Sequence, residues 1–427
     1  MHQRSVLDNG LTVLTVRMPL VRSVSVAYFF GAGSRYESDQ EAGVSHFLEH
    51  LLFKGTRKRP EAQMISGFIE RLGGYMNAAT DREMTMYWTK VARPFFPEAL
   101  DLLTDMALNS ALDPVELERE RKVILEEISS VDDSPASKVD VLIDEAVWPG
   151  QPLGRDVAGT KDSVSGISRD MIIGYLGSQY SANNTVLAVA GDLEHEGVVA
   201  AVRSETEGWK TGTPRPWIRS VPPTRGPVAV MENRKTQQAH FILGLRGLSS
   251  QHPHRYALDL LNTILGEGMS SRLFVELREK LGLAYDVHSS VSHYLDDGVI
   301  NVYAGVDPKQ IHDAIGRAKE EMYKMRDPIP DEEIKKAKAM VKGRMLLRTE
   351  DSRTMASWFG AQELLNRKIR TIDEVVEILG FLLYLVAGIG KGRPALFSSR
   401  YYEHYNVSLA RPKPWALRKP ASLAVER

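Results

Sequence analysis

Residues 43–56, from Gly43 to Thr56, read GVSHFLEHLLFKGT and contain the pattern H-x-x-E-H at His46, Glu49 and His50. We predict one helix from Glu41 to about Phe53. Residues three and four apart on a helix share a face, so both histidines point the same way with Glu49 beside them. Two neutral imidazoles can hold a zinc ion, and a neighbouring carboxylate can take a proton from an activated water. The stretch therefore predicts a metal-binding helix.

A catalytic zinc site keeps three protein ligands, so one more ligand is expected elsewhere in the chain. The candidates lie in LERERKVILEEISS, residues 117–130. Glu120 and Glu127 are seven positions apart, which is two helical turns, so they share a face. Glu126 is the neighbouring alternative to Glu127, and spacing does not exclude a slip of one residue. An acidic surface helix without any metal would carry the same charges.

Together these two stretches resemble the inverzincin zinc peptidases of the pitrilysin and insulysin family, and within it the short subunits related to the mitochondrial processing peptidase. The resemblance implies that His46, His50 and Glu127 bind one zinc ion per chain. It assigns Glu49 as the general base and Glu120 as a support for the ligands. Two imidazoles and a carboxylate also accept cobalt or manganese, so the identity of the metal stays open.

The resemblance also implies residues that bind the substrate. The segment GGYMNAATDREMTMYW, residues 73–88, is similar to an edge strand that pairs with the substrate backbone. The positions assigned to that contact are Asn77, Ala78, Ala79 and Thr80. In residues 270–287, SSRLFVELREKLGLAYDV, Arg278 and Tyr285 match a pair that helps to bind substrate and stabilise the reacting carbonyl. Without the family, these segments read as an ordinary hairpin, a surface arginine and a half-buried strand tyrosine.

Composition narrows the classes of function. The chain has 427 residues, with 43% hydrophobic and 26% charged residues, which is typical of a globular protein with two or more domains. A formal net charge of -1 gives no reason to expect a nucleic acid or an anionic membrane as partner. The absence of cysteine excludes disulfides, thiolate ligands and a cysteine nucleophile. We expect a cytoplasmic protein, because the N-terminus lacks signal and transit patterns and the longest apolar run is too short to span a membrane.

The chain order predicts an α+β fold with two similar α/β sandwich domains, each a mixed, largely antiparallel sheet packed with helices. Residues 1–210 form the predicted metal-binding domain. Residues 211–227 contain five prolines and are the predicted linker. Residues 228–427 form the second domain, which carries the Arg278 and Tyr285 pair. The resemblance runs from about residue 3 to 375. From about 376 we predict an atypical tail, in which 406–409 is a remnant strand and the final stretch, rich in Pro, Lys and Arg, is disordered.

The resemblance implies a zinc metalloendopeptidase that hydrolyses peptides or unfolded and targeting segments. Family members enclose a clam-shell chamber with four such domains, and this chain supplies two. A homodimer is therefore expected, with a heterodimeric processing peptidase as an alternative. The other alternative is a non-catalytic core-type assembly subunit. Such relatives usually lose the metal motif, and the presence of Glu49 favours the enzyme.

Overall fold

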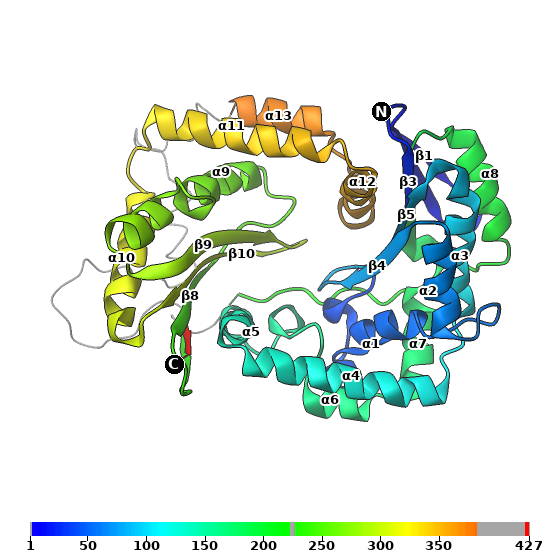
Figure 1. The fold of residues 1–427 in the computed structure, drawn as a ribbon, viewed down its shortest axis with the longest axis horizontal. Helices are drawn as coiled ribbons and strands as arrows, with labels where there is room; N and C mark the ends of the chain where they lie inside the picture. The colour runs from blue at the N-terminus through cyan, green and yellow to red at the C-terminus, as the bar shows by residue number, and fades with distance from the viewer. Residues whose placement is uncertain (1, 223–225, 227, 382–422, 427) are drawn as a thin grey trace. The chain divides into compact units, whose positions relative to one another are not determined.

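The computed structural model describes residues 2–222, 226, 228–381 and 423–426 (Figure 1). Their contacts divide into two compact units, each made of three separate segments of chain. Unit 1 consists of Met1–Ile128, Asp156–Ile218 and Leu346–Arg370. Unit 2 consists of Ser129–Arg155, Arg219–Met345 and Thr371–Arg427.

Unit 1 contains a six-stranded sheet in the order β1-β2-β6-β3-β5-β4. All neighbouring strands are antiparallel except β2 and β6, which are parallel. The tight turn between β1 and β2 closes at Gly10, whose φ of 85° is in the left-handed region that favours glycine. The strands are β1 (His2–Val6), β2 (Thr12–Arg17), β3 (Ser23–Phe30), β4 (Tyr75–Thr80), β5 (Thr85–Ala92) and β6 (Thr185–Gly191).

Strand β3 explains how both faces of this sheet are covered. Tyr28 and Phe30 belong to the main hydrophobic core of unit 1, together with side chains of the metal helix. On the opposite face, Ser25 is hydrogen bonded to Ser352, and Phe29 lies against Gly360, where a Cβ would approach to 2.2 Å. Alternate residues of a strand point to opposite faces, so a strand covered on both sides is almost continuously apolar.

The helices of unit 1 flank this sheet. The helix α12 lies on one face, although it follows β6, the last strand of this sheet in the chain, by more than a third of the chain length. The α-helices assigned wholly to unit 1 are α1 (Val44–Leu52), α2 (Ala62–Arg71), α3 (Phe96–Asn109), α6 (Lys161–Gly166), α7 (Arg169–Gln179), α8 (His195–Glu205) and α12 (Ser352–Asn366). The long helix α4 (Pro114–Asp133) begins in unit 1 and ends in unit 2.

Unit 2 contains a five-stranded sheet in the order β7-β11-β8-β10-β9. Among the neighbouring strand pairs of this sheet, β11 and β7 are parallel and the other pairs are antiparallel. Its strands are β7 (Ala229–Glu232), β8 (Ala239–Arg246), β9 (Ala284–His293), β10 (Gly298–Val306) and β11 (Leu423–Glu426). Its helices include α5 (Pro135–Val147), α9 (Arg255–Gly266), η6 (Phe274–Lys280, a π-helix), α10 (Ile311–Lys324), α11 (Asp331–Arg348, whose last residues belong to unit 1) and α13 (Ile372–Phe381).

The predicted fold class of two α/β domains with mixed, largely antiparallel sheets is confirmed. The boundary between Ile218 and Arg219 falls inside the predicted linker, but the units are not continuous halves of the chain. The helix α5 belongs to unit 2 because its buried residues, such as Ile143, share a core with the β8 residue Ile242. Trp148 strengthens this packing by donating its indole N–H to Asp297 at 2.9 Å.

One local expectation is wrong: the charged residues around His195 predict a surface position for this side chain. His195 is in fact 7% exposed; its Nε2 atom lies 2.8 Å from the Ser5 hydroxyl, and its Nδ1 atom lies 2.8 Å from the Thr15 hydroxyl. The C-terminal stretch contributes a strand, β11, at 423–426, whereas the predicted remnant strand at 406–409 lies outside the described residues.

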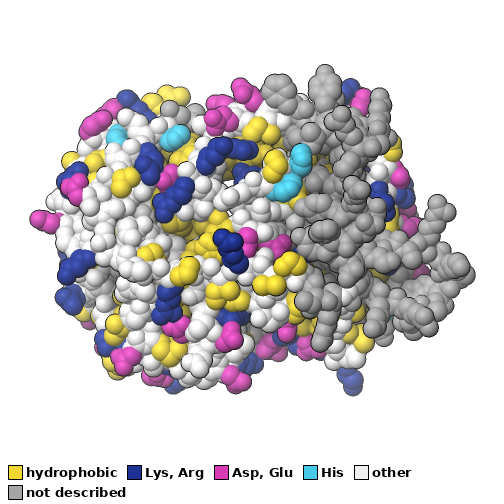
Figure 2. Space-filling view, turned by 180° about the vertical axis from the view of Figure 1, so that it is seen from behind, with side chains coloured by type: hydrophobic (Ala, Val, Ile, Leu, Met, Phe, Trp, Pro, Cys, Tyr) yellow, Lys and Arg dark blue, Asp and Glu magenta, His cyan; other side chains and the backbone are white. Residues whose placement is uncertain are grey.

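Figure 2 shows basic and acidic side chains interspersed over the face that it draws. None of the helices in the described ranges is long and apolar enough to cross a membrane.

Candidate metal centre

The helix α1 carries the H-x-x-E-H pattern and is held in place by its apolar face. Phe47, Leu48 and Leu51 are buried in the core of unit 1. The opposite face therefore turns His46 and His50 outward, with their ring centroids 4.7 Å apart. The observed helix is shorter than the predicted one, because a separate 3-10 turn over Asp39–Glu41 precedes it.

The carboxylate of Glu127 on α4 completes a group of three metal-ligating side chains. Its Oε2 atom lies 3.8 Å from Nε2 of His46 and 3.5 Å from Nε2 of His50. Ligand atoms of the three residues all lie within 4.8 Å of one another. Within the described part of the chain, no other group of His, Asp or Glu side chains meets this criterion, and Glu126 is not part of the group.

Glu120 is buried and contacts the ligand His50 without belonging to the group of metal donors. It is 5% exposed, and its Oε2 atom is 3.1 Å from Nδ1 of His50. Its other oxygen is 2.8 Å from the Lys54 ammonium, which balances the charge of the buried carboxylate. A neutral imidazole has one N–H, and a carboxylate at Nδ1 holds the proton there. The arrangement leaves Nε2 of His50 free to bind a metal.

The chemistry of the three donors fits zinc. Burial, followed by the nearby His50, lowers the pKa of His46 to about 4, so its imidazole is neutral at neutral pH. Two neutral imidazoles and one carboxylate are a donor set found in catalytic zinc sites. The set leaves room in the coordination shell for a water or a substrate oxygen. Residues of this chain therefore fit the metal that the sequence pattern implies.

Glu49 lies on the same helix as the two histidines and is anchored by Thr80. The Thr80 hydroxyl donates a hydrogen bond to Oε2 of Glu49 at 2.5 Å. Burial raises the pKa of Glu49, and the hydrogen bond from Thr80 and the nearby His50 oppose that rise. A partly desolvated carboxylate with a raised pKa is better suited to accept and release a proton near neutral pH.

The strand β4 forms an edge of the sheet in unit 1, because β5 is its only partner among the described strands. All four predicted substrate-binding residues are on this strand. Asn77 and Ala79 are exposed, while Ala78 and Thr80 are half-buried. An edge strand offers unpaired backbone N–H and C=O groups to a further strand.

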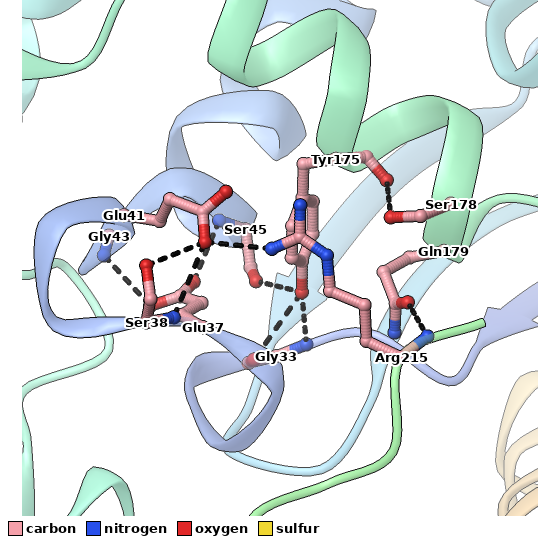
Figure 3. Close-up of polar contacts among 10 residues, drawn as sticks. All are labelled: Gly33, Glu37, Ser38, Glu41, Gly43, Ser45, Tyr175, Ser178, Gln179 and Arg215. Carbon is pink, nitrogen blue, oxygen red and sulfur yellow. Dashed lines mark hydrogen bonds and ion pairs between the residues drawn. The ribbon is translucent and has the colours of Figure 1, made fainter.

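The segment before α1 fixes the start of the metal helix, and sequence reasoning did not identify its residues (Figure 3). The buried carboxylate of Glu37 accepts the backbone N–H groups of Gly43 and Ser45, both at 2.9 Å. A carboxylate at a helix N-terminus satisfies free N–H groups and interacts favourably with the helix dipole. Gly43 itself has a φ of 94°, and a Cβ there would approach the Ala158 carbonyl oxygen to 2.5 Å.

Two further residues in Figure 3 extend this support. The Ser45 hydroxyl donates to the buried Tyr175 hydroxyl at 2.7 Å, which also accepts the Gly33 N–H at 3.2 Å. Arg215, inside the predicted linker, forms an ion pair with Glu41 at 2.7 Å. The one sequence signal for this network was the glycine-rich, acidic loop ahead of the motif.

Arg278 and Tyr285 both lie in unit 2 and are in contact with each other. The Arg278 guanidinium carbon lies 4.9 Å from the ring centroid of Tyr285 and 4.8 Å from that of Phe274. Arg278 is on η6, and Tyr285 is on β9 with 76% of its surface exposed. The π-helical winding of η6 was not predicted, since the sequence of this segment suggests an ordinary helix.

Comparisons with known proteins give matches over most of the chain. Residues 12–161 match the family described as insulinase (peptidase family M16), and residues 166–341 match the peptidase M16 inactive domain. The chain is 38% identical over 383 residues to an uncharacterized zinc protease of Streptomyces coelicolor, covering 88% of this chain and 83% of that one. It is 34% identical over 384 residues to an uncharacterized zinc protease of Bacillus subtilis, covering 89% and 92% of the two chains.

Solved structures with the same fold include a protease from Helicobacter pylori, with a TM-score of 0.83, 22% identity and coverage of 100% of this chain and 99% of that one. A peptidase M16 inactive domain from Pseudomonas fluorescens gives a TM-score of 0.85 at 17% identity, covering 100% and 97%. A chain of complex III from Candida albicans gives 0.79 at 22% identity, covering 91% and 92%. At these identities the likeness concerns the fold.

Proposed function

The chain belongs to the insulinase family of peptidases, family M16, and on that premise we propose that it is a zinc metalloendopeptidase acting on peptides and unfolded polypeptide segments. The observation that carries the proposal is the meeting of His46, His50 and Glu127 beside the carboxylate of Glu49. Sequence relatives named as zinc proteases support the same class of chemistry.

In this proposal His46, His50 and Glu127 hold the ion. When bound, zinc supplies Lewis-acid activation of a water and of the substrate carbonyl. Glu120 keeps the His50 proton on Nδ1, so that Nε2 stays available as a donor. Burial keeps His46 neutral for the same purpose.

Glu49 moves the proton. Its Oε2 atom accepts the Thr80 hydroxyl, which leaves Oε1 to take a proton from the attacking water. The carboxylic acid then returns that proton to the amide nitrogen of the leaving peptide. The raised pKa of Glu49, caused by burial, favours both the uptake and the return.

The substrate is read through its backbone. We propose that an extended segment pairs with the edge strand β4 along Asn77, Ala78, Ala79 and Thr80. Main-chain pairing tolerates many side chains, so broad sequence specificity is expected. Arg278 and Tyr285 present a guanidinium and a phenol O–H, two groups that can donate to the oxygen of a reacting carbonyl.

We propose that two copies of the chain form the working enzyme and enclose the substrate in a clam-shell chamber. Each copy carries both a metal centre and an Arg278–Tyr285 pair, so a homodimer contains every required part. The pair of one subunit would then serve the metal centre of the other. Light scattering of the purified chain should give twice the monomer mass, and a monomer or a required second chain would contradict this assembly.

A non-catalytic assembly subunit is the second candidate function. It is favoured by the match of residues 166–341 to a domain described as inactive and by the structural likeness to a complex III chain. The first half of the chain argues for the enzyme, because it keeps the three metal donors and Glu49. An assembly subunit needs none of these four side chains.

The test is hydrolysis of a quenched fluorescent peptide by the wild type and Glu49→Gln, with metal analysis of both. We expect Glu49→Gln to keep about one zinc ion per chain and to lose about 10²- to 10⁴-fold in kcat, because general base catalysis is removed while the ligands stay. Glu126→Gln is the matched control, since Glu126 lies outside the group of donors. Absence of zinc-dependent hydrolysis by the wild type would overturn the proposed function.

A further inference from the structure

Thr80 does more in this structure than lie on the predicted substrate-binding strand. It is the last residue of β4, it pairs with Thr85 in the register of β4 and β5, and it is half-buried. Its hydroxyl is directed at Glu49 and donates to Oε2 at 2.5 Å. The strand that ends at Thr80 therefore reaches the carboxylate of the proposed base directly.

We propose that Thr80 is a positioning residue that fixes the Glu49 carboxylate through its hydroxyl, and so couples substrate pairing on β4 to the orientation of the base. This inference rests on the proposed peptidase function. It adds a role for the Thr80 side chain that a backbone contact with substrate does not require.

The physical basis is the freedom of a glutamate side chain. Three rotatable bonds separate the Glu49 carboxylate from its helix, and the last of them has a broad torsional minimum. A hydrogen bond to Oε2 fixes the plane of the carboxylate and assigns Oε1 to the reacting water. Proton transfer requires the donor and acceptor atoms within hydrogen-bond reach, so a carboxylate that turns freely spends less time in the productive position.

The link to substrate follows from the register of the edge strand. Thr80 continues the same backbone as Asn77, Ala78 and Ala79, so a substrate strand that orders β4 also orders the Thr80 hydroxyl. Glu49 is then held in place when the scissile peptide is held in place. Under the alternative, in which Thr80 is merely a substrate contact, loss of its hydroxyl raises KM and leaves kcat unchanged.

Thr80→Val removes the hydroxyl and keeps the shape and the β-branched carbon that suits a strand. Thr80→Ser restores the hydroxyl. We expect Thr80→Val to lower kcat by about 10- to 100-fold with KM within about twofold of the wild type, and Thr80→Ser to recover most of kcat. Zinc content and the affinity of the metal-free protein for the same peptide should not change in either variant.

Thr85→Val is the matched control. Thr85 faces Thr80 on the neighbouring strand, but its hydroxyl donates to the Ala32 carbonyl at 3.2 Å and does not touch Glu49. Its kcat should stay within about twofold of the wild type. A Thr80→Val enzyme with wild-type kcat, with a change confined to KM, or with lost zinc would overturn the positioning role while the activity of the wild type still upholds the peptidase. Inactive wild type would instead overturn the proposed function itself.

Discussion

A carboxylate oxygen of Glu120 lies 3.1 Å from Nδ1 of His50, on the side of the imidazole that faces away from the other two metal donors. Glu120 is buried and is itself paired with Lys54 at 2.8 Å. The orientation of one metal-ligating ring therefore depends on a residue that does not join the group of donors.

Replacement of Glu120 tests this dependence. Glu120→Gln keeps the size of the side chain but removes the negative charge that holds the proton on Nδ1 of His50. We expect zinc affinity, measured by competition with a fluorescent chelator, to fall by about 10- to 100-fold. Glu118→Gln, an exposed change on the same helix at a residue paired with Arg121, should leave affinity unchanged. Equal affinities for the two variants would refute a supporting role for Glu120.

The choice between Glu127 and Glu126 can be settled by zinc-dependent stabilisation. A ligand that binds the folded state at 100 times its Kd stabilises it by about 2.7 kcal/mol. Added zinc should raise the Tm of the wild type and of Glu126→Gln by similar amounts. Glu127→Gln should show a much smaller rise, because a charged donor is lost from the group. The opposite pattern would mean that the neighbouring acid is the ligand.

Glu37→Ala should weaken the folded state through the start of α1. The substitution leaves the N–H groups of Gly43 and Ser45 without the carboxylate that accepts them. Since hydrogen bonds to charged groups contribute about 1.5–3 kcal/mol each, we expect the free energy of unfolding in urea to fall by roughly 3 kcal/mol. Glu61→Ala, at an exposed glutamate, should cost less than about 0.5 kcal/mol. A similar loss in both variants would argue against the cap.

The stability of the metal-free protein should depend on pH through His46. Its folded pKa is about 4 and its ordinary value is 6.5, so between these values the unfolded chain binds a proton that the folded chain excludes. The free energy of unfolding should therefore decrease as the pH is lowered from 6.5 towards 4, by up to about 3 kcal/mol from this group. Urea titrations of His46→Asn should give a flatter profile over the same interval, and profiles of identical slope would exclude the effect.

Much of the local structure followed from sequence pattern. The edge strand that the family resemblance implies within residues 73–88 is observed as β4, and the metal helix forms because its apolar face is periodic. Helical spacing also puts Glu120 and Glu127 on one face, whereas the position of Glu120 beside the ligands was implied only by the family resemblance. These features are local, or depend on the repeat of a single helix.

The unpredicted features depend on partners that are distant in sequence. Nothing in the composition of α5 or α12 says which sheet it covers, because any apolar helix face suits either core. His195 was predicted at the surface from its charged neighbours, yet Ser5 and Thr15 provide two hydroxyls that satisfy a buried imidazole. Thr80 was assigned only to substrate binding, because neither the sequence around Thr80 nor that around Glu49 indicates a hydrogen bond between the two side chains.

Glu127 differs from its two companions in one respect, since 46% of its side chain is exposed while the histidines are about one-fifth exposed. Buffer components can reach the site from the carboxylate side. The metal content of protein purified with EDTA or on an immobilised-nickel column will thus reflect the purification, and cobalt or manganese can replace the physiological ion. Identification of that ion calls for isolation from cells without chelators or metal-charged resins.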